Sequence, residues 1–201
     1  AIQRADFVFW SFIFSAVSLA ADLARTLDQL IVEGVAPSKL RELDLSGELS
    51  AHWNVSLGQL EAILESWPRE LQRLGRIDLA DRRNRQLKRV AERWRDAPPE
   101  GFVIAAGIST GAPAVARLLG TVARIPHGKV VLAGLDLDIS EEEWDAIGGS
   151  STEPGIETHP QFHLHRLLAR MKIGRCEVGR WKWSGDIAST AKRARAISHA
   201  F

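Results

Sequence analysis

Residues 103–136 read VIAAGISTGAPAVARLLGTVARIPHGKVVLAGLD, and this stretch decides the fold class of the second half of the chain. It begins with a short apolar run and continues through a glycine-rich turn into a segment with helical periodicity. It ends with a second apolar run that starts at Val130. Two parallel strands joined by a helix are the unit from which nucleotide-binding α/β domains are built. The sequence therefore predicts a strand, a helix and a second, parallel strand, and the continuous apolar character of the second strand predicts that both its faces are covered.

The helix predicted within this stretch has one apolar face. Apolar residues recur at spacings of three and four, which is the pattern of an amphipathic α-helix. Pro113 suits its first turn, because the missing N–H removes a donor that the helix would not have used. Residues 125–128, IPHG, are typical of a helix end. The apolar face consists of Val115, Leu118, Leu119 and Val122.

The turn at residues 107–111, GISTG, precedes this helix. Backbone N–H groups at a helix N-terminus can bind phosphate, but serine and threonine also cap helices in proteins of every kind, so both roles are open. The turn lacks the Gly-Lys-Ser/Thr ending of a Walker A loop, in which the lysine reaches the outer phosphates, so we expect no ATP hydrolysis by this chain alone. Asp136 and Asp138 are suited to hold Mg²⁺ only in an intact nucleotide site, and we expect a turn or cap role for them. The candidate residues of a degenerate nucleotide site are Gly107, Ser109, Thr110 and Gly111.

The composition is that of an ordinary globular protein. Of 201 residues, 45% are hydrophobic and 25% are charged, and the net charge of +1 leaves any nucleic-acid binding to local basic patches. The single cysteine, Cys176, excludes an internal disulfide and fits a reducing cytoplasm. Residues 7–14, FVFWSFIF, are too few to span a bilayer, so we expect no membrane partner. We interpret them as the start of a buried helix, or as a face that packs against sequence missing from this chain.

A helical region is predicted to precede the α/β region. Residues 97–101, APPEG, separate the two, so the expected domains are a helical region at 1–97 and an α/β region at 98–201 with a basic C-terminal helix. Pro68 predicts a kink or a break near Trp67. Ser140 and the three glutamates after it are typical of a capping box. Helices are expected at about 16–34, 52–74, 79–96, 160–171 and 186–201, with another starting after Ser140.

Two basic patches are candidate DNA contacts. The helix predicted at 79–96 is dense in arginine and sparse in acids, and a phosphate backbone would be attracted to it in a salt-dependent way. The alternative is a solvated helix face, or arginines that pair with acids of a neighbouring helix. In the second patch Trp181 and Trp183 accompany the basic residues and can stack on bases, although tryptophans are more often core or interface residues. The candidates are Arg82, Arg83, Arg85, Lys88 and Arg89 in the first patch, and Lys182, Lys192 and Arg193 in the second.

Three histidines cluster in the sequence HPQFHLH. His159 and His163 are four residues apart and can share a helix face, but a zinc site needs more ligands, and only Cys176 is near in sequence. We therefore expect surface or helix-start histidines and no metal site. No Ser-His-Asp or Cys-His arrangement is readable from the spacing, so no catalytic residue is predicted.

Collinear segments of this chain resemble the helicase-like portion of AddB-type double-strand-break repair proteins in their alphaproteobacterial form. The resemblance extends from about residue 16 to residue 201, and no single motif decides it. The matching segments are HW at 52–53, DRRNR at 81–85, GISTGAP at 107–113, ARLL at 116–119, VVLAGLD at 130–136, WDAI at 144–147, HPQF at 159–162 and LL at 167–168.

This resemblance implies a fold related to P-loop NTPases, in which residues 1–97 correspond to a 1B-like insertion and the α/β part to a degenerate helicase core. AddB proteins work with AddA in a helicase–nuclease that resects broken DNA ends in the bacterial cytoplasm, at the nucleoid. Residues 105–107, AAG, stand where an active helicase has its Walker B acids, so the resemblance implies that this chain is an excised, non-catalytic piece. The iron–sulfur cluster of the family would lie in a nuclease domain beyond residue 201, so no cofactor is expected here.

Three hypotheses about function follow. The first is a degenerate helicase-like segment that contacts DNA as a scaffold, with DNA and an AddA-like subunit as partners. The second is a small enzyme that binds a nucleotide or sugar phosphate at residues 107–111. The third is a protein-interaction module, which differs from the first only in lacking affinity for DNA.

Overall fold

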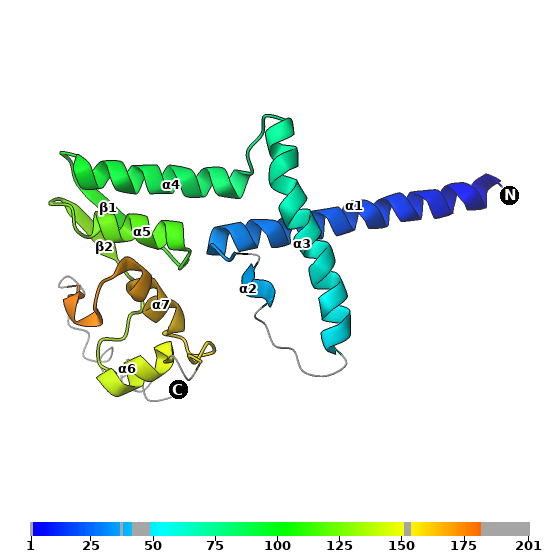
Figure 1. The fold of residues 1–201 in the computed structure, drawn as a ribbon. Coiled ribbons are helices and arrows are strands. Elements are labelled where there is room, and N and C mark those ends of the chain that lie inside the picture. The colour runs from blue at the N-terminus through cyan, green and yellow to red at the C-terminus, as the bar shows by residue number, and fades with distance from the viewer. Residues whose placement is uncertain (1, 37, 42–48, 151–153, 182–201) are drawn as a thin grey trace. The chain divides into compact units, whose positions relative to one another are not determined.

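The computed structural model describes residues 2–36, 38–41, 49–150 and 154–181 (Figure 1). Over these residues the chain is mixed α/β, mostly helical, with one small sheet of two parallel strands. Helices precede the α/β part, as predicted. The chain divides into two compact units, Ala1–Arg85 and Gln86–Phe201. The helix predicted at 186–201 lies outside the described residues.

The first unit contains α1 (Ile2–Glu33), α2 (Ser38–Arg41), α3 (Leu49–Arg73) and the first turns of α4 (Leu79–Asp96). α1 includes the apolar residues 7–14, which we interpret from their sequence as the start of a helix, and it continues without a break through the helix predicted at 16–34. It ends where Gly34 adopts a φ of 66°, which is the left-handed conformation that glycine favours after a helix.

α3 runs through Pro68 without a break, so the alternative of a break near Trp67 is wrong. A proline removes one backbone donor from a helix, and the bonds on either side keep this long helix continuous. The next helix begins at a capping aspartate: Asp78 accepts a hydrogen bond from the backbone N–H of Ala80 at 2.9 Å. The indole N–H of Trp67 donates to the other carboxylate oxygen of Asp78 at 3.4 Å.

The second unit contains the predicted strand–helix–strand arrangement. β1 (Val103–Ala106) and β2 (Gly128–Val131) pair in parallel, with Val103 opposite Gly128 and Ala106 opposite Val131, and α5 (Pro113–Val122) connects them. β2 starts at Gly128, two residues earlier than the predicted apolar run, after the short turn at residues 123–127 that follows α5. A Cβ atom at Gly128 would lie 1.8 Å from the carbonyl oxygen of Val122, so only glycine fits this close return of the chain.

β1 is covered on one face. Val103 and Ala105 are half-buried, and Ala105 packs against the core that α5 contributes to, whereas the alternating residue Ile104 is 65% exposed. Phe102, just before β1, is 84% exposed. In β2, for which the sequence predicts that both faces are covered, Val130 and Val131 lie on alternate faces and are both half-buried.

Three helices build the core of the second unit. α7 (Phe162–Met171) packs against α5 on one side and against α6 (Glu141–Gly148) on the other. Ser140 and Glu143 form the predicted capping box, in which the backbone N–H of Glu143 donates to the Ser140 hydroxyl at 3.1 Å and that of Ser140 donates to the Glu143 carboxylate at 3.0 Å. The 3-10 helix η1 (Arg175–Glu177) follows α7. The buried core residues are Ala116, Leu119, Leu167 and Met171, and beside them Ile139, Trp144, Ile147 and Leu168.

Candidate functional site

The turn before α5 lacks some of the backbone donors that a helix start can offer to a phosphate. Gly107 has a φ of 70° and ends β1, and the exposed Thr110 accepts a hydrogen bond through its hydroxyl from the N–H of Ala112 at 3.2 Å. Pro113, the first residue of α5, has no N–H. Two of the backbone positions at this helix start therefore have no N–H to offer, and Gly111 accepts a hydrogen bond from Arg170 through its carbonyl oxygen.

The basic residues of α4 lie on its exposed side. Its inward side carries Ala80, Asn84, Leu87, Ala91 and Trp94, at alternating spacings of four and three. This periodicity leaves the basic residues between them in solvent. We call the exposed set Arg82, Arg83, Arg85, Lys88 and Arg89 the α4 stripe.

The acids that pair with the α4 stripe lie within α4 itself. Arg85 forms an ion pair with Asp81 at 2.6 Å, and Lys88 approaches Glu92 at 3.8 Å, both one helical turn away. Arg82, Arg83 and Arg89 form no ion pair with another described residue. Because a helix rises about 1.5 Å per residue, Arg82 and Arg89 are about 10 Å apart along its axis, on the same side. Three guanidinium groups of the stripe therefore remain available to an anionic partner.

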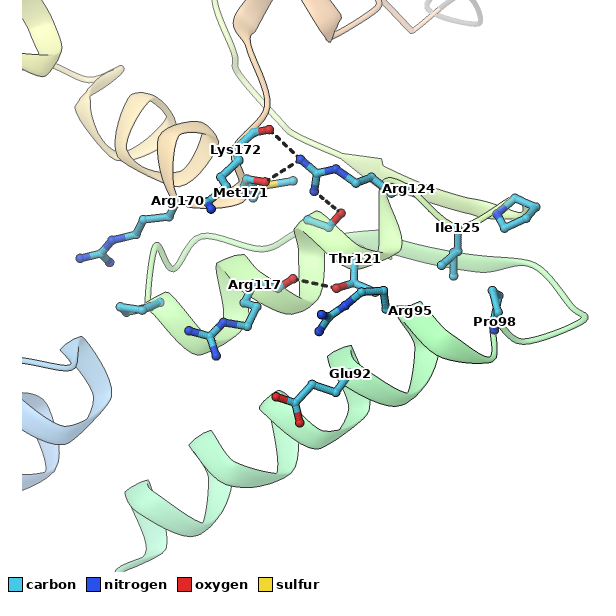
Figure 2. Close-up of a pocket in the computed structure, with 13 residues that line it drawn as sticks. Glu92, Arg95, Pro98, Arg117, Thr121, Arg124, Ile125, Arg170, Met171 and Lys172 are labelled. Atoms are coloured by element: carbon cyan, nitrogen blue, oxygen red, sulfur yellow. Dashed lines mark hydrogen bonds between the residues drawn. The ribbon is translucent and has the colours of Figure 1, made fainter.

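A groove runs along α5 within the second unit (Figure 2). It has a volume of about 730 Å³, and its walls are the last turn of α4, one side of α5 and the C-terminal end of α7. Five cationic side chains and one carboxylate, that of Glu92, line it together with prolines, Ile125 and Met171. We call it the α5 groove, and its cations are Arg95, Arg117, Arg124, Arg170 and Lys172.

Two of these cations hold the elements of the groove together. The guanidinium of Arg124 donates to the carbonyl oxygen of Gly120 at 2.6 Å, and it reaches α7 to donate to the carbonyl oxygens of Met171 at 3.1 Å and Lys172 at 2.6 Å (Figure 2). Arg170 donates to the carbonyl of Gly111, at the start of α5. Both arginines therefore join α5 to α7. Sequence reasoning missed them, since the partners are 47 to 59 residues apart and the acceptors are backbone atoms.

The remaining three cations of the groove are exposed. Arg95 comes from α4, Arg117 from α5 and Lys172 from the residue that caps α7. In Figure 2 the side chains of Arg95 and Arg117 extend into the space between α4 and α5. None of the three forms an ion pair or a side-chain hydrogen bond with another described residue, although Glu92 lies in the same groove. The groove therefore has walls that are held together by hydrogen bonds, and three positively charged side chains without an ionic partner among the described residues.

The aspartates after β2 form hydrogen bonds and an ion pair that stabilise a turn. The side chain of Asp136 accepts from the N–H of Asp138 at 2.8 Å, and the N–H of Asp136 donates to the side-chain oxygen of Gln161 at 3.0 Å. The Gln161 amide N–H in turn donates to the carbonyl of Gly134 at 2.9 Å, and Asp138 pairs with Arg180. This arrangement is the turn role that the sequence favoured. Gln161 itself was not singled out, because a lone glutamine carries no recognisable pattern.

The histidines of HPQFHLH have separate surroundings. His159 accepts from the N–H of Gln161 at 3.1 Å, and the exposed His163 lies edge-on to Phe162. His165 is half-buried against the indole of Trp144, with ring centroids 4.8 Å apart, and this burial lowers the pKa of its imidazole, while the Asp145 carboxylate raises the pKa to a smaller extent. Among the described residues, no group of three His, Cys, Asp or Glu side chains is placed to hold a metal ion.

The second predicted patch is only partly described. Trp181 is 62% exposed, whereas Lys182, Lys192 and Arg193 lie outside the described residues. Within the described part of the chain, no helix is both long and apolar enough to cross a membrane. No family model, curated protein or solved structure matches this chain.

Proposed function

We propose that this chain is a non-catalytic, DNA-contacting segment of a helicase–nuclease subunit that resembles AddB. The observation that carries the proposal is the α4 stripe, in which Arg82, Arg83 and Arg89 project from a helix into solvent without an ionic partner among the described residues. Guanidinium groups arranged in this way bind successive phosphates of a nucleic-acid backbone and release its condensed counterions.

The surroundings of the stripe also support this function. The sequence segments that resemble AddB include residues 81–85, the start of the stripe. The turn at 107–111 has neither the lysine of a Walker A loop nor a full set of free N–H donors, which favours a scaffold over a nucleotide-hydrolysing domain. We further propose a degenerate helicase-like fold, an AddA-like partner subunit and a place at the nucleoid for the protein.

Salt-dependent DNA binding tests the proposed function. We would titrate fluorescently labelled single-stranded and duplex DNA with the chain at several salt concentrations, and compare it with the triple variant Arg82→Ala, Arg83→Ala, Arg89→Ala. If each arginine contacts one phosphate, the slope of log K against log salt decreases by about 2 for single strands and by about 3 for duplex DNA. Alanine is a good helix former, so α4 should remain folded in the variant.

A matched control removes the same number of charges elsewhere. Arg69, Arg76 and Lys129 are exposed and lie outside the α4 stripe, and the triple alanine variant at these positions should keep most of the affinity and the slope. Equal losses in the two variants would show that binding responds only to net charge. Absence of measurable DNA binding by the unaltered chain would reject the scaffold role.

A further inference from the structure

The α5 groove has features of a binding site that the proposed function does not use. Its cations are distinct from the α4 stripe: Arg95 lies beyond the stripe on α4, and the other four come from α5, α7 and the residues just after these two helices. Arg124 and Arg170 fix the two helices relative to each other through backbone carbonyls of both. Binding sites that hold their geometry without ligand lose less conformational entropy when the ligand arrives.

The free charges of this groove set the chemistry of its ligand. Arg95, Arg117 and Lys172 reach the groove from three different elements, and Glu92 is its one carboxylate. Guanidinium and ammonium groups are the side chains that bind phosphate oxygens, the guanidinium as a fork and the ammonium as a point charge. A groove that gathers three of them with a single acid favours an anion with more than one negative charge.

The size and lining of the groove limit further which ligands it can bind. A volume of about 730 Å³ is within the range of small-molecule sites and exceeds the space that one phosphate needs. The groove is lined by prolines and aliphatic side chains and, over the described residues, by no aromatic ring, so it offers no platform on which a nucleobase would stack. Recognition would therefore come from the phosphates and not from a base.

We propose that the α5 groove binds a diphosphate group, held by Arg95, Arg117 and Lys172. Two linked phosphates carry enough negative charge to engage cations from three elements at once. The diphosphate of a nucleotide and inorganic pyrophosphate have this chemistry in common, and the site binds both with comparable affinity. This proposal is independent of DNA binding by the α4 stripe.

Calorimetric titration of the purified chain with sodium pyrophosphate tests the proposal, with ADP and adenosine as further arms. We expect saturable binding of pyrophosphate and ADP and none of adenosine, which lacks phosphate. No saturable binding of pyrophosphate at concentrations up to about 10 mM, weaker than the usual range of specific ligands, would overturn the proposal. So would binding of ADP that adenosine reproduces, because the groove would then recognise the nucleoside.

Two variants locate the site without disturbing the fold. Lys172 occupies a left-handed conformation at the end of α7, with φ 57° and ψ 48°, so Lys172→Gly removes the ammonium and places the favoured residue at this position. Its backbone carbonyl, which Arg124 needs, is retained. In the second variant, Arg117→Gln, a side chain without a bonded partner is replaced on the surface of α5. Each variant should weaken pyrophosphate binding about tenfold or more, as the loss of one charge-assisted hydrogen bond does.

Matched controls separate this site from the rest of the surface. Lys129→Gln removes an exposed charge outside the groove and should leave pyrophosphate affinity unchanged, as should the triple alanine variant of the α4 stripe. Circular dichroism of each variant establishes that it is folded. Equal losses in the groove variants and in Lys129→Gln would overturn the assignment to this groove, whatever the outcome of the DNA titrations.

Discussion

Replacing Arg124 by methionine should weaken the attachment of α7 to α5. The guanidinium makes three hydrogen bonds, and two of them cross to the carbonyls of Met171 and Lys172 at the end of α7. A hydrogen bond from a charged donor contributes about 1.5–3 kcal/mol, and we take the lower value because the Arg124 side chain is exposed and water can replace it. For the two crossing bonds, the free energy of unfolding of the second unit should therefore fall by about 3 kcal/mol.

The matched control for this change is Arg117→Met. Arg117 lies on α5, seven residues before Arg124, and its side chain has no bonded partner among the described residues, so its loss should change the stability by no more than about 0.5 kcal/mol. Urea unfolding, followed by tryptophan fluorescence and circular dichroism, measures both variants. Trp144 reports on the second unit, because it is buried against α7. If the two methionine variants have the same stability within about 0.5 kcal/mol, the carbonyl contacts of Arg124 do not hold the helices together.

Two further predictions concern the same unit. Gly128→Ala places a Cβ 1.8 Å from the carbonyl oxygen of Val122, and only a shift of the backbone can relieve this clash. Thermal unfolding should therefore show that the free energy of unfolding falls by about 3 kcal/mol or more. The control Gly179→Ala, which has open space around its Cβ, should leave the free energy of unfolding nearly unchanged. Burial lowers the pKa of His165 below its ordinary value of 6.5, so the unfolded chain binds a proton at a higher pH than the folded chain does. The stability that His165 contributes is therefore complete above pH 6.5 and should decrease as the pH falls from 6.5 through the folded pKa. Urea unfolding at a series of pH values should show this decrease and its absence in His165→Gln, and a decrease that is identical in the variant would contradict the role of His165.

Local patterns in the sequence predicted most of the secondary structure. The apolar periodicity of residues 113–122 and the capping box at Ser140 each depend on a few neighbouring residues, and both are found in the structure. The α4 stripe could be predicted for the same reason, because the inward spacing of its apolar residues fixes which arginines face solvent. The break that Pro68 suggested is absent, because whether a helix continues through a proline depends on all the residues around it.

Contacts between distant segments could not be predicted in this way. The α5 groove depends on arginines that donate to backbone carbonyls. Every residue has a carbonyl, so no sequence pattern shows which carbonyl an arginine will bind. The burial of His165 against Trp144 likewise depends on how α6 meets α7, and the sequence favoured a surface histidine. The exposure of Ile104 in β1 was not predicted, because an apolar residue in a strand shows what the strand can bury and not whether a partner lies over it.

The three carbonyls that Arg124 binds have an electrostatic consequence for the groove. Peptide dipoles that align along a helix leave about half a negative charge at its C-terminal end. α5 and α7 both end beside the groove, so the two helix ends together act like about one negative elementary charge, which would repel an anion. The one positive charge of Arg124, bonded to carbonyls from both helix ends, offsets it. The sign of the field in the groove is therefore set in part by a residue that no bound anion has to contact.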